Sequence, residues 1–217
     1  MIQAVIFDLD GVIVTTDDCH YRAWKTIADQ EGIYFDRTIN ERLRGVSRME
    51  SLEILLERAD KSYTSEQKEA LATSKNEIYK QLILSLTPDD LLEGVKEVLT
   101  ILKNNNIKIA VGSSSKNTPL ILERIGLSTF FDAVSDGNNI THSKPHPEVF
   151  IKAADMLGIP CRNCLVFEDA DAGVAAAIAA NMKVFGVGFA AHNPSVAYGS
   201  PRMDHQLIEE LKVCCGI

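Results

Sequence analysis

Residues 4–11 read AVIFDLDG, an apolar run that ends in two aspartates separated by one residue. Side chains alternate between the two faces of a strand, so we expect Asp8 and Asp10 to emerge on one side while Leu9 turns into the protein. Two carboxylates this close repel each other and favour a cation beside them, and oxygen ligands suit Mg²⁺. A carboxylate held against Mg²⁺ can also attack phosphorus, because the metal withdraws phosphate charge. A solvated acidic turn is the alternative, and this stretch alone does not decide between the two.

The overall composition is that of a globular protein and argues against several classes of partner. The chain has 217 residues, of which 46% are hydrophobic and 24% are charged, and these values are ordinary for a globular domain. Its net charge of −8 disfavours nucleic acid or an anionic membrane as the main partner. A local basic pocket for a phosphorylated ligand remains compatible with this charge. No apolar run approaches the ~20 residues that span a bilayer, and the N-terminus lacks a basic signal-peptide region, so the expected location is cytoplasmic.

The cysteines and histidines do not predict a zinc site. Five cysteines at irregular spacing fit a reducing compartment better than a disulfide framework. Cys161 and Cys164 form one C-x-x-C, but no second pair supplies the remaining ligands. His142 and His146 flank a Lys-Pro pair, which excludes an i, i+4 pairing on one helix. We therefore expect Cys161 in a loop and Cys164 at the start of a buried strand.

Apolar runs and helical patterns alternate along most of the chain. Runs like the first occur at residues 107–112, 132–135, 164–167 and 183–188, and the run at 132–135 is short. Helical patterns occupy residues 95–104, 119–125, 148–157 and 173–180, with Asn117 or Thr118 able to cap the second of these. Continuous apolar runs are typical of parallel strands buried on both faces. The alternation predicts an α/β fold, a doubly wound, Rossmann-like parallel sheet with right-handed crossovers.

Residues 16–87 interrupt this alternation. The segment is rich in polar residues and helical throughout, and it lacks a strand signal. An unusually long crossover is one interpretation, but a connection of this length normally has its own fold and function. We therefore expect residues 1–15 and 88–217 to form the α/β core and residues 16–87 to form an inserted helical cap domain.

Polar clusters follow several of the expected strands. The two aspartates follow the first strand, the run GSSSKN at 112–117 follows the second, and Glu168 and Asp169 follow the strand at 164–167. Lys144 opens the approach to a further helix. Ligands bind beyond the carboxyl ends of the strands in such sheets, so these groups are expected to meet at one edge. Hydroxyls, backbone amides and a cation before a helix are typical of a phosphate cradle.

Together these segments resemble the four motifs of the haloacid dehalogenase superfamily of phosphotransferases. The matching stretches are FDLDG at 7–11, SSSKN at 113–117, SKP at 143–145 and EDADAG at 168–173. In the cap, His20, Trp24, RGVSR at 44–48 and SKN at 74–76 resemble the superfamily's phosphomutase branch. The similarity covers nearly the whole chain, including the insertion.

The resemblance implies a role for each matching residue. Asp8 is the implied nucleophile that forms an aspartyl-phosphate. Asp10 is the implied general acid and base, with its carbonyl on Mg²⁺, and Glu168 and Asp169 complete the metal shell. The implied substrate-binding residues are Ser113 and Lys144 at the transferring phosphoryl group, Arg48, Ser115, Lys116 and Asn117 at a second phosphate, and His20, Gly45, Val46 and Lys75 on the cap side. Ser114 and Trp24 are further implied substrate-binding residues.

The implied activity is the interconversion of β-glucose 1-phosphate and glucose 6-phosphate through a glucose 1,6-bisphosphate. A capped sugar-phosphate phosphatase is the alternative, because fold and core motifs do not separate the two. A phospho-accepting receiver module explains neither the cap nor the Asp8/Asp10 pair. Thr15, Arg44 and Ala170 depart from the usual family pattern, and the first two touch the hinge and the cap. We expect a monomer whose partner is a small sugar phosphate.

Overall fold

The computed structural model describes residues 1–217 and contains one six-stranded parallel sheet. The strand order is β3-β2-β1-β4-β5-β6, with every neighbouring pair parallel. The strands are β1 Ala4–Phe7, β2 Lys108–Gly112, β3 Ala133–Ser135, β4 Cys164–Glu168, β5 Lys183–Val187 and β6 Tyr198–Ser200. This topology confirms the predicted doubly wound α/β class. All five expected strands are present, and β6 is one that the sequence patterns did not predict.

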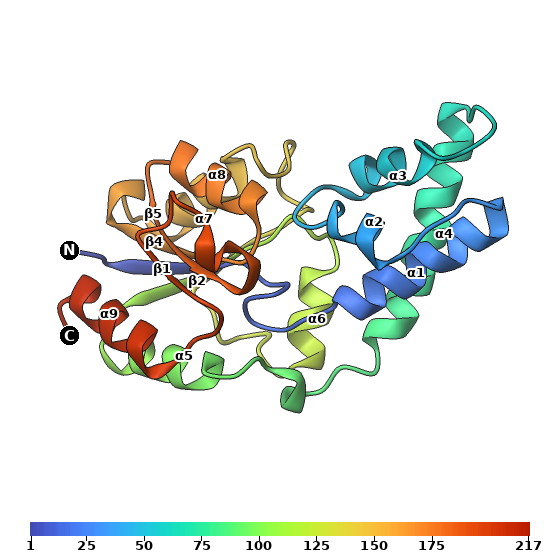
Figure 1. The fold of residues 1–217 in the computed structure, drawn as a ribbon. Coiled ribbons are helices and arrows are strands. Elements are labelled where there is room, and N and C mark those ends of the chain that lie inside the picture. Colours follow the sequence, from blue (N-terminus) through green and yellow to red (C-terminus); the bar gives the residue numbers. More distant parts are fainter.

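Helices cover both faces of the sheet because the side chains of β1 alternate between two cores. Val5 and Phe7 belong to a cluster with residues of α5 (Val95–Asn104) and α9 (His205–Cys215). Ala4 and Ile6 belong to a cluster with residues of α7 (Glu148–Leu157) and α8 (Asp171–Ala179). Figure 1 shows α5 and α9 on one side of the sheet and α7 and α8 on the other. The strands are therefore buried on both faces, as their continuous apolar runs predict.

The helices of the core match the sequence patterns closely. They are α5 Val95–Asn104, α6 Thr118–Arg124, α7 Glu148–Leu157, α8 Asp171–Ala179 and α9 His205–Cys215, with short 3₁₀ turns η1 Pro88–Asp90, η2 Cys161–Asn163 and η3 Gly188–His192. Helix α9 was not predicted, although Asp204 caps its first turn and Gly216 ends it in a left-handed conformation. Asn117 occupies the cap position of α6 without a capping hydrogen bond, and its side-chain NH2 group donates to Asn76 at 2.9 Å.

Residues between β1 and η1 form a separate group of helices beyond the sheet (Figure 1). These are α1 Asp17–Glu31, α2 Arg37–Glu41, α3 Arg48–Leu56 and α4 Ser65–Ile83. They pack around their own buried cluster, which includes Trp24, Ile27, Phe35 and Leu52. None of the helices is long and apolar enough to cross a membrane.

The cysteines and the two histidines lie where the sequence predicts, but the histidines are close together. Cys161 begins η2, Cys164 begins β4, and all five cysteines are free thiols. His142 and His146 lie outside any helix, as expected, yet their rings lie 4.6 Å apart between centroids. The loop before α7 therefore brings the two rings together without an i, i+4 pairing on a helix.

Candidate active site

Three carboxylates and one ammonium group meet at the carboxyl edge of the sheet. The register pairs Phe7 with Phe167, so the residues that follow, Asp8 and Glu168, emerge side by side. Oxygens of Asp8, Glu168 and Asp169 lie within 4.8 Å of one another, and all three residues are buried. Lys144 Nζ donates to Asp8 Oδ1 and to Glu168 Oε1, each at 2.5 Å.

The electrostatics of this group favour a bound cation. Burial and the nearby charges of Glu168 and Asp8 raise the pKa of Asp169 to about 9, and burial also raises the pKa of Glu168. Burial alone lowers the pKa of Lys144, but the charges of Asp8 and Glu168 outweigh that effect and raise it. One ammonium group does not balance three converging carboxylates. Hard oxygen donors with excess negative charge are the ligand set that Mg²⁺ prefers, so these residues fit a divalent cation.

Two glycines that the sequence analysis did not single out make room for these carboxylates. A Cβ on Gly173 would lie 1.6 Å from Glu168 Oε1, and a Cβ on Gly11 would lie 2.1 Å from Asp169 Oδ2. Gly11 also has a positive φ of 84°, which L side chains rarely adopt. Both motif glycines are therefore required sterically at the site.

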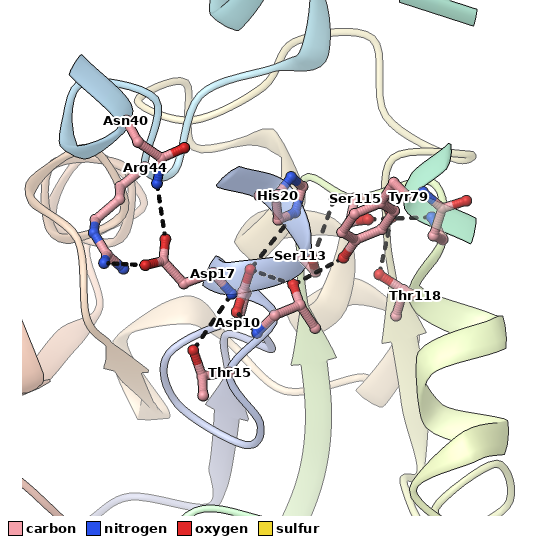
Figure 2. A network of polar contacts seen from close by, with 12 residues as sticks. Asp10, Thr15, Asp17, His20, Asn40, Arg44, Tyr79, Ser113, Ser115 and Thr118 are labelled. Atoms are coloured by element: carbon pink, nitrogen blue, oxygen red, sulfur yellow. Dashed lines mark hydrogen bonds and ion pairs between the residues drawn. The ribbon is translucent and has the colours of Figure 1, made fainter. Parts of the chain in front are cut away.

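Asp10 is held by a network that reaches into α4. Its carboxylate accepts the backbone N–H and the hydroxyl of Thr16, both at 2.6 Å, and the Thr16 hydroxyl lies 2.8 Å from the hydroxyl of Tyr79. Figure 2 shows Asp10 next to His20, whose Nε2 lies 3.6 Å from Asp10 Oδ2. Burial raises the pKa of Asp10, and the hydrogen bonds from Thr16 lower it. The effect of burial is larger, so the pKa is raised to about 6. A carboxyl group with this pKa can both accept and donate a proton near neutral pH.

A buried lysine lies behind His20. Lys75 Nζ lies 2.8 Å from His20 Nδ1 and stacks over the rings of Trp24 and Tyr79, at 5.1 and 4.5 Å from their centroids. Burial and then the charge of Arg48 lower the pKa of Lys75 to about 7. Burial and the Lys75 charge lower the pKa of His20 well below its usual value. His20 is therefore a neutral imidazole close to Asp10.

A second group of cations faces the same cavity without carboxylate partners. A capping box between Ser47 and Glu50 starts α3, so Arg48 is its first residue, where the helix dipole also favours an anion. Neither Arg48 nor Lys116 forms an ion pair, and burial lowers the pKa of Arg48. The loop before α6 adds hydroxyls and amides, and Ser113 Oγ accepts the backbone N–H of Ser115 at 3.2 Å. This arrangement fits a phosphate group.

One cavity of about 1200 Å³ brings together every site residue expected from the sequence. It is lined by all of them: Asp8, Asp10, His20, Trp24, Gly45, Val46, Arg48, Lys75, Ser113, Ser114, Ser115, Lys116, Asn117, Lys144, Glu168 and Asp169. The walls come from both the helical insertion and the sheet edge. A ligand inside this cavity therefore contacts both.

Arg44 links the two walls, and its partners were not predicted. Its guanidinium contacts Glu41 at 2.8 Å, Asp17 at 3.0 Å and Asp169 at 3.9 Å, and it stacks 4.2 Å from the centroid of the Phe189 ring. Figure 2 shows Arg44 and Asn40 converging on Asp17, with Asn40 donating at 3.2 Å. The sequence marked Arg44 as a departure from the family pattern, but it gave no signal for the residues that it joins.

Comparisons with known proteins point to phosphotransfer. The family model of haloacid dehalogenase-like hydrolases matches residues 2–181. β-Phosphoglucomutase from Bacillus subtilis is 48% identical over 86% of this chain and 83% of that protein. Fructose-1-phosphate phosphatase from Escherichia coli is 33% identical over 82% of this chain and 92% of that protein. The crystal structure of β-phosphoglucomutase from Clostridium difficile has a TM-score of 0.90 at 40% identity, covering 97% of this chain and 96% of that one.

Proposed function

The chain belongs to the haloacid dehalogenase-like hydrolase family, and from this premise we propose that it is a β-phosphoglucomutase. The reaction is the interconversion of β-glucose 1-phosphate and glucose 6-phosphate through an aspartyl-phosphate and glucose 1,6-bisphosphate. Close homology to the Bacillus subtilis and Clostridium difficile enzymes supports the proposal. Five free thiols fit a cytoplasmic, reducing setting.

The observation that carries the proposal is the second set of cations in the cavity. A phosphatase needs one phosphate site, whereas a mutase must hold one phosphate while it exchanges the other. Arg48 and Lys116 line the cavity with no carboxylate partner, while Lys144 is paired with Asp8 and Glu168. The unpaired guanidinium of Arg48 offers the planar fork that suits a phosphate. We assign the non-reacting phosphate to these residues, together with Ser115 and Asn117.

Asp8 is the proposed nucleophile. Lys144 holds Asp8 Oδ1 at 2.5 Å, and no protein hydrogen bond is made to the other oxygen, Oδ2. Oδ2 attacks phosphorus as the bond between phosphorus and the sugar oxygen breaks. Lys144 and Ser113 stabilise the charge on the transferring group, and phosphoryl transfer depends mainly on such positioning and charge stabilisation.

Asp10 is the proposed acid and base. It delivers a proton to the leaving sugar oxygen when the aspartyl-phosphate forms. It then removes the proton from the sugar hydroxyl that attacks the aspartyl-phosphate. Thr16 fixes the orientation of its carboxylate, and the nearby His20 stays neutral and adds no charge that would hold Asp10 ionised.

Asp8, Glu168, Asp169 and the Asp10 carbonyl are the proposed ligands of Mg²⁺. When bound, this ion supplies charge neutralisation for the transferring phosphoryl group. The proposed cap, residues 16–87, keeps water away from the aspartyl-phosphate. A hydrogen bond from Asn117 to Asn76 joins it to the core.

The experiment compares Arg48→Ala with the parent and with Arg58→Ala, which changes an exposed arginine of the same helical segment that does not line the cavity. Each protein receives Mg²⁺, β-glucose 1-phosphate and a trace of glucose 1,6-bisphosphate. Glucose 6-phosphate and inorganic phosphate are then measured together. Losing a charge-assisted fork costs roughly 2–4 kcal/mol of transition-state binding, which is a loss of roughly 30- to 1000-fold.

We expect Arg48→Ala to lose isomerisation by this factor while hydrolysis persists or rises, and Arg58→Ala to behave like the parent. Equal isomerisation by the parent and Arg48→Ala would remove the support for a second phosphate site at Arg48. If the parent releases inorganic phosphate and forms no glucose 6-phosphate, the chain is instead a capped sugar-phosphate phosphatase.

A further inference from the structure

Two histidines and a glutamate converge at an exposed part of the cavity wall, on the segment that leads into α7. His142 and His146 line the cavity and are exposed. One donor atom each from His142, His146 and Glu148 lies within 4.8 Å of the other two. These residues take no part in the proposed phosphotransfer, so their convergence needs its own explanation.

The glutamate of this cluster is fixed in place by the protein. Glu148 Oε1 accepts the backbone N–H of Thr141 at 3.0 Å and contacts Lys152 Nζ at 2.9 Å. Glu148 Oε2 accepts the backbone N–H of His142 at 2.8 Å. Three donors therefore hold the carboxylate in its ionised form, and the backbone contacts tie the segment with Thr141 and His142 to the start of α7.

The two imidazoles present nitrogens to the same region. His142 Nδ1 lies 3.1 Å from Glu148 Oε2. His146 Nδ1 accepts the backbone N–H of Glu148 over a long distance of 3.3 Å, so this nitrogen carries a lone pair. Ligand atoms around a tetrahedral Zn²⁺ ion with bonds of 2.0–2.1 Å lie roughly 3.3 Å apart. The separation between His142 Nδ1 and Glu148 Oε2 is close to this value, and the donor atoms of all three residues lie within 4.8 Å of one another.

We propose that His142, His146 and Glu148 bind one Zn²⁺ ion, at a site separate from the carboxylates of Asp8 and Asp169. Two imidazole nitrogens and one carboxylate oxygen form a donor set that Zn²⁺ uses in proteins, with a fourth position left open. Mg²⁺ prefers oxygen ligands only, so the two sites select different ions. The bound ion replaces the proton between His142 Nδ1 and Glu148 Oε2.

An ion bound at this site would restrain the loop that carries Lys144. Ser143, Lys144 and Pro145 lie between the two histidines in the sequence, and Lys144 holds Asp8. An ion bound by both histidines closes this segment into a short loop and limits its motion. We therefore expect Zn²⁺ to stabilise the folded protein, because it binds the native loop and not the unfolded chain.

The experiment titrates the full-length protein with Zn²⁺ in the presence of saturating Mg²⁺, which occupies the carboxylate site. Bound zinc is counted after dialysis, and Tm is measured with and without Zn²⁺. We expect the parent to bind one Zn²⁺ and to gain Tm. His142→Ala and His146→Ala should bind it at least tenfold more weakly, since even outer-shell partners are worth roughly 10- to 100-fold in metal affinity.

Two controls separate this site from other zinc ligands. His192→Ala removes an exposed histidine far from the cluster in sequence, and Cys161→Ser removes one thiol of the C-x-x-C pair. Both should keep the bound zinc and the gain in Tm. Equal zinc binding by the parent and His142→Ala, or its loss in Cys161→Ser, would overturn the proposal. Because His142 and His146 are exposed, their variants should fold, and an unchanged Tm without zinc checks this.

Discussion

Replacing Thr16 with valine tests the proposed acid–base role of Asp10 through its pKa. The substitution keeps the β-branched shape and the backbone N–H bond to Asp10, but it removes the hydroxyl that donates at 2.6 Å. A hydrogen bond to a carboxylate favours its ionised form, so losing the bond raises the pKa of Asp10 further above the value of about 6 in the parent.

The size of the shift follows from the strength of one charge-assisted hydrogen bond. Such bonds contribute roughly 1.5–3 kcal/mol, but the Asp10 side chain keeps 36% of its accessible surface, so solvent screens it. The lower end of the range, about 1.5 kcal/mol, corresponds to an upward shift of about one pKa unit. The carboxylate form then exists only at higher pH, so the acidic limb of the rate profile moves toward neutral pH.

The assay is kcat/KM for isomerisation of β-glucose 1-phosphate as a function of pH, which reports groups on the free enzyme. Thr16→Ser keeps the hydroxyl and should restore the parent profile. Tyr79→Phe removes the outer hydroxyl of the network, leaves the bond from Thr16 to Asp10 and should shift the profile less. An acidic limb that stays in place in folded Thr16→Val would refute the assignment of that limb to Asp10.

Three further predictions concern charge and space in the cavity. In Asp169→Asn, the metal-free protein should gain Tm at neutral pH and respond less to Mg²⁺. The reason is that the pKa of Asp169 in the parent is raised to about 9, so the stability of the metal-free parent falls as the pH rises from about 4 to about 9. Lys75→Met should raise the free energy of unfolding in urea at about pH 6 and lose that advantage near pH 10. The reason is that the folded protein lowers the pKa of Lys75 to about 7, so the parent gains stability as the pH rises from about 6 to about 10. Gly173→Ala should keep its circular dichroism spectrum but lose roughly 10- to 100-fold in kcat/KM, since Glu168 must move.

The sheet was predictable because its strands carry their own signal. A strand buried on both faces is a continuous apolar run, and each central strand of this protein is one. The edge strand β6 has three residues, YGS, with Gly199 at its centre, so local pattern says nothing about it. Its pairing with β5 is a long-range effect. The α9 helix carried cap signals at both ends, and attention to them would have found it.

The core of the site was predictable for a related reason. Strand ends in a parallel sheet meet at one edge, so residues such as Asp8 and Glu168 could be brought together from sequence position alone. Contacts between residues at opposite ends of the insertion could not be predicted from the sequence. The bond from Thr16 to Tyr79 spans 63 positions, and no pattern in either segment indicates the other. Asn40, buried with one side-chain oxygen unpartnered, was missed for the same reason.

Pairing of charge, and not the presence of charge, distinguishes the two halves of the cavity. Lys144 and Arg44 are held by carboxylates within 2.5 and 2.8 Å, so an anion that binds to either of them shares it with an existing ion pair. Arg48 and Lys116 have no such partner, and an anion that binds there displaces no existing ion pair. Each of these four residues is simply a basic side chain in the sequence, and only their neighbours in space assign them to different tasks. Under the proposed function, the second phosphate site therefore depends on cap and loop cations that are left unpaired, and it requires no change in the carboxylates of the sheet edge.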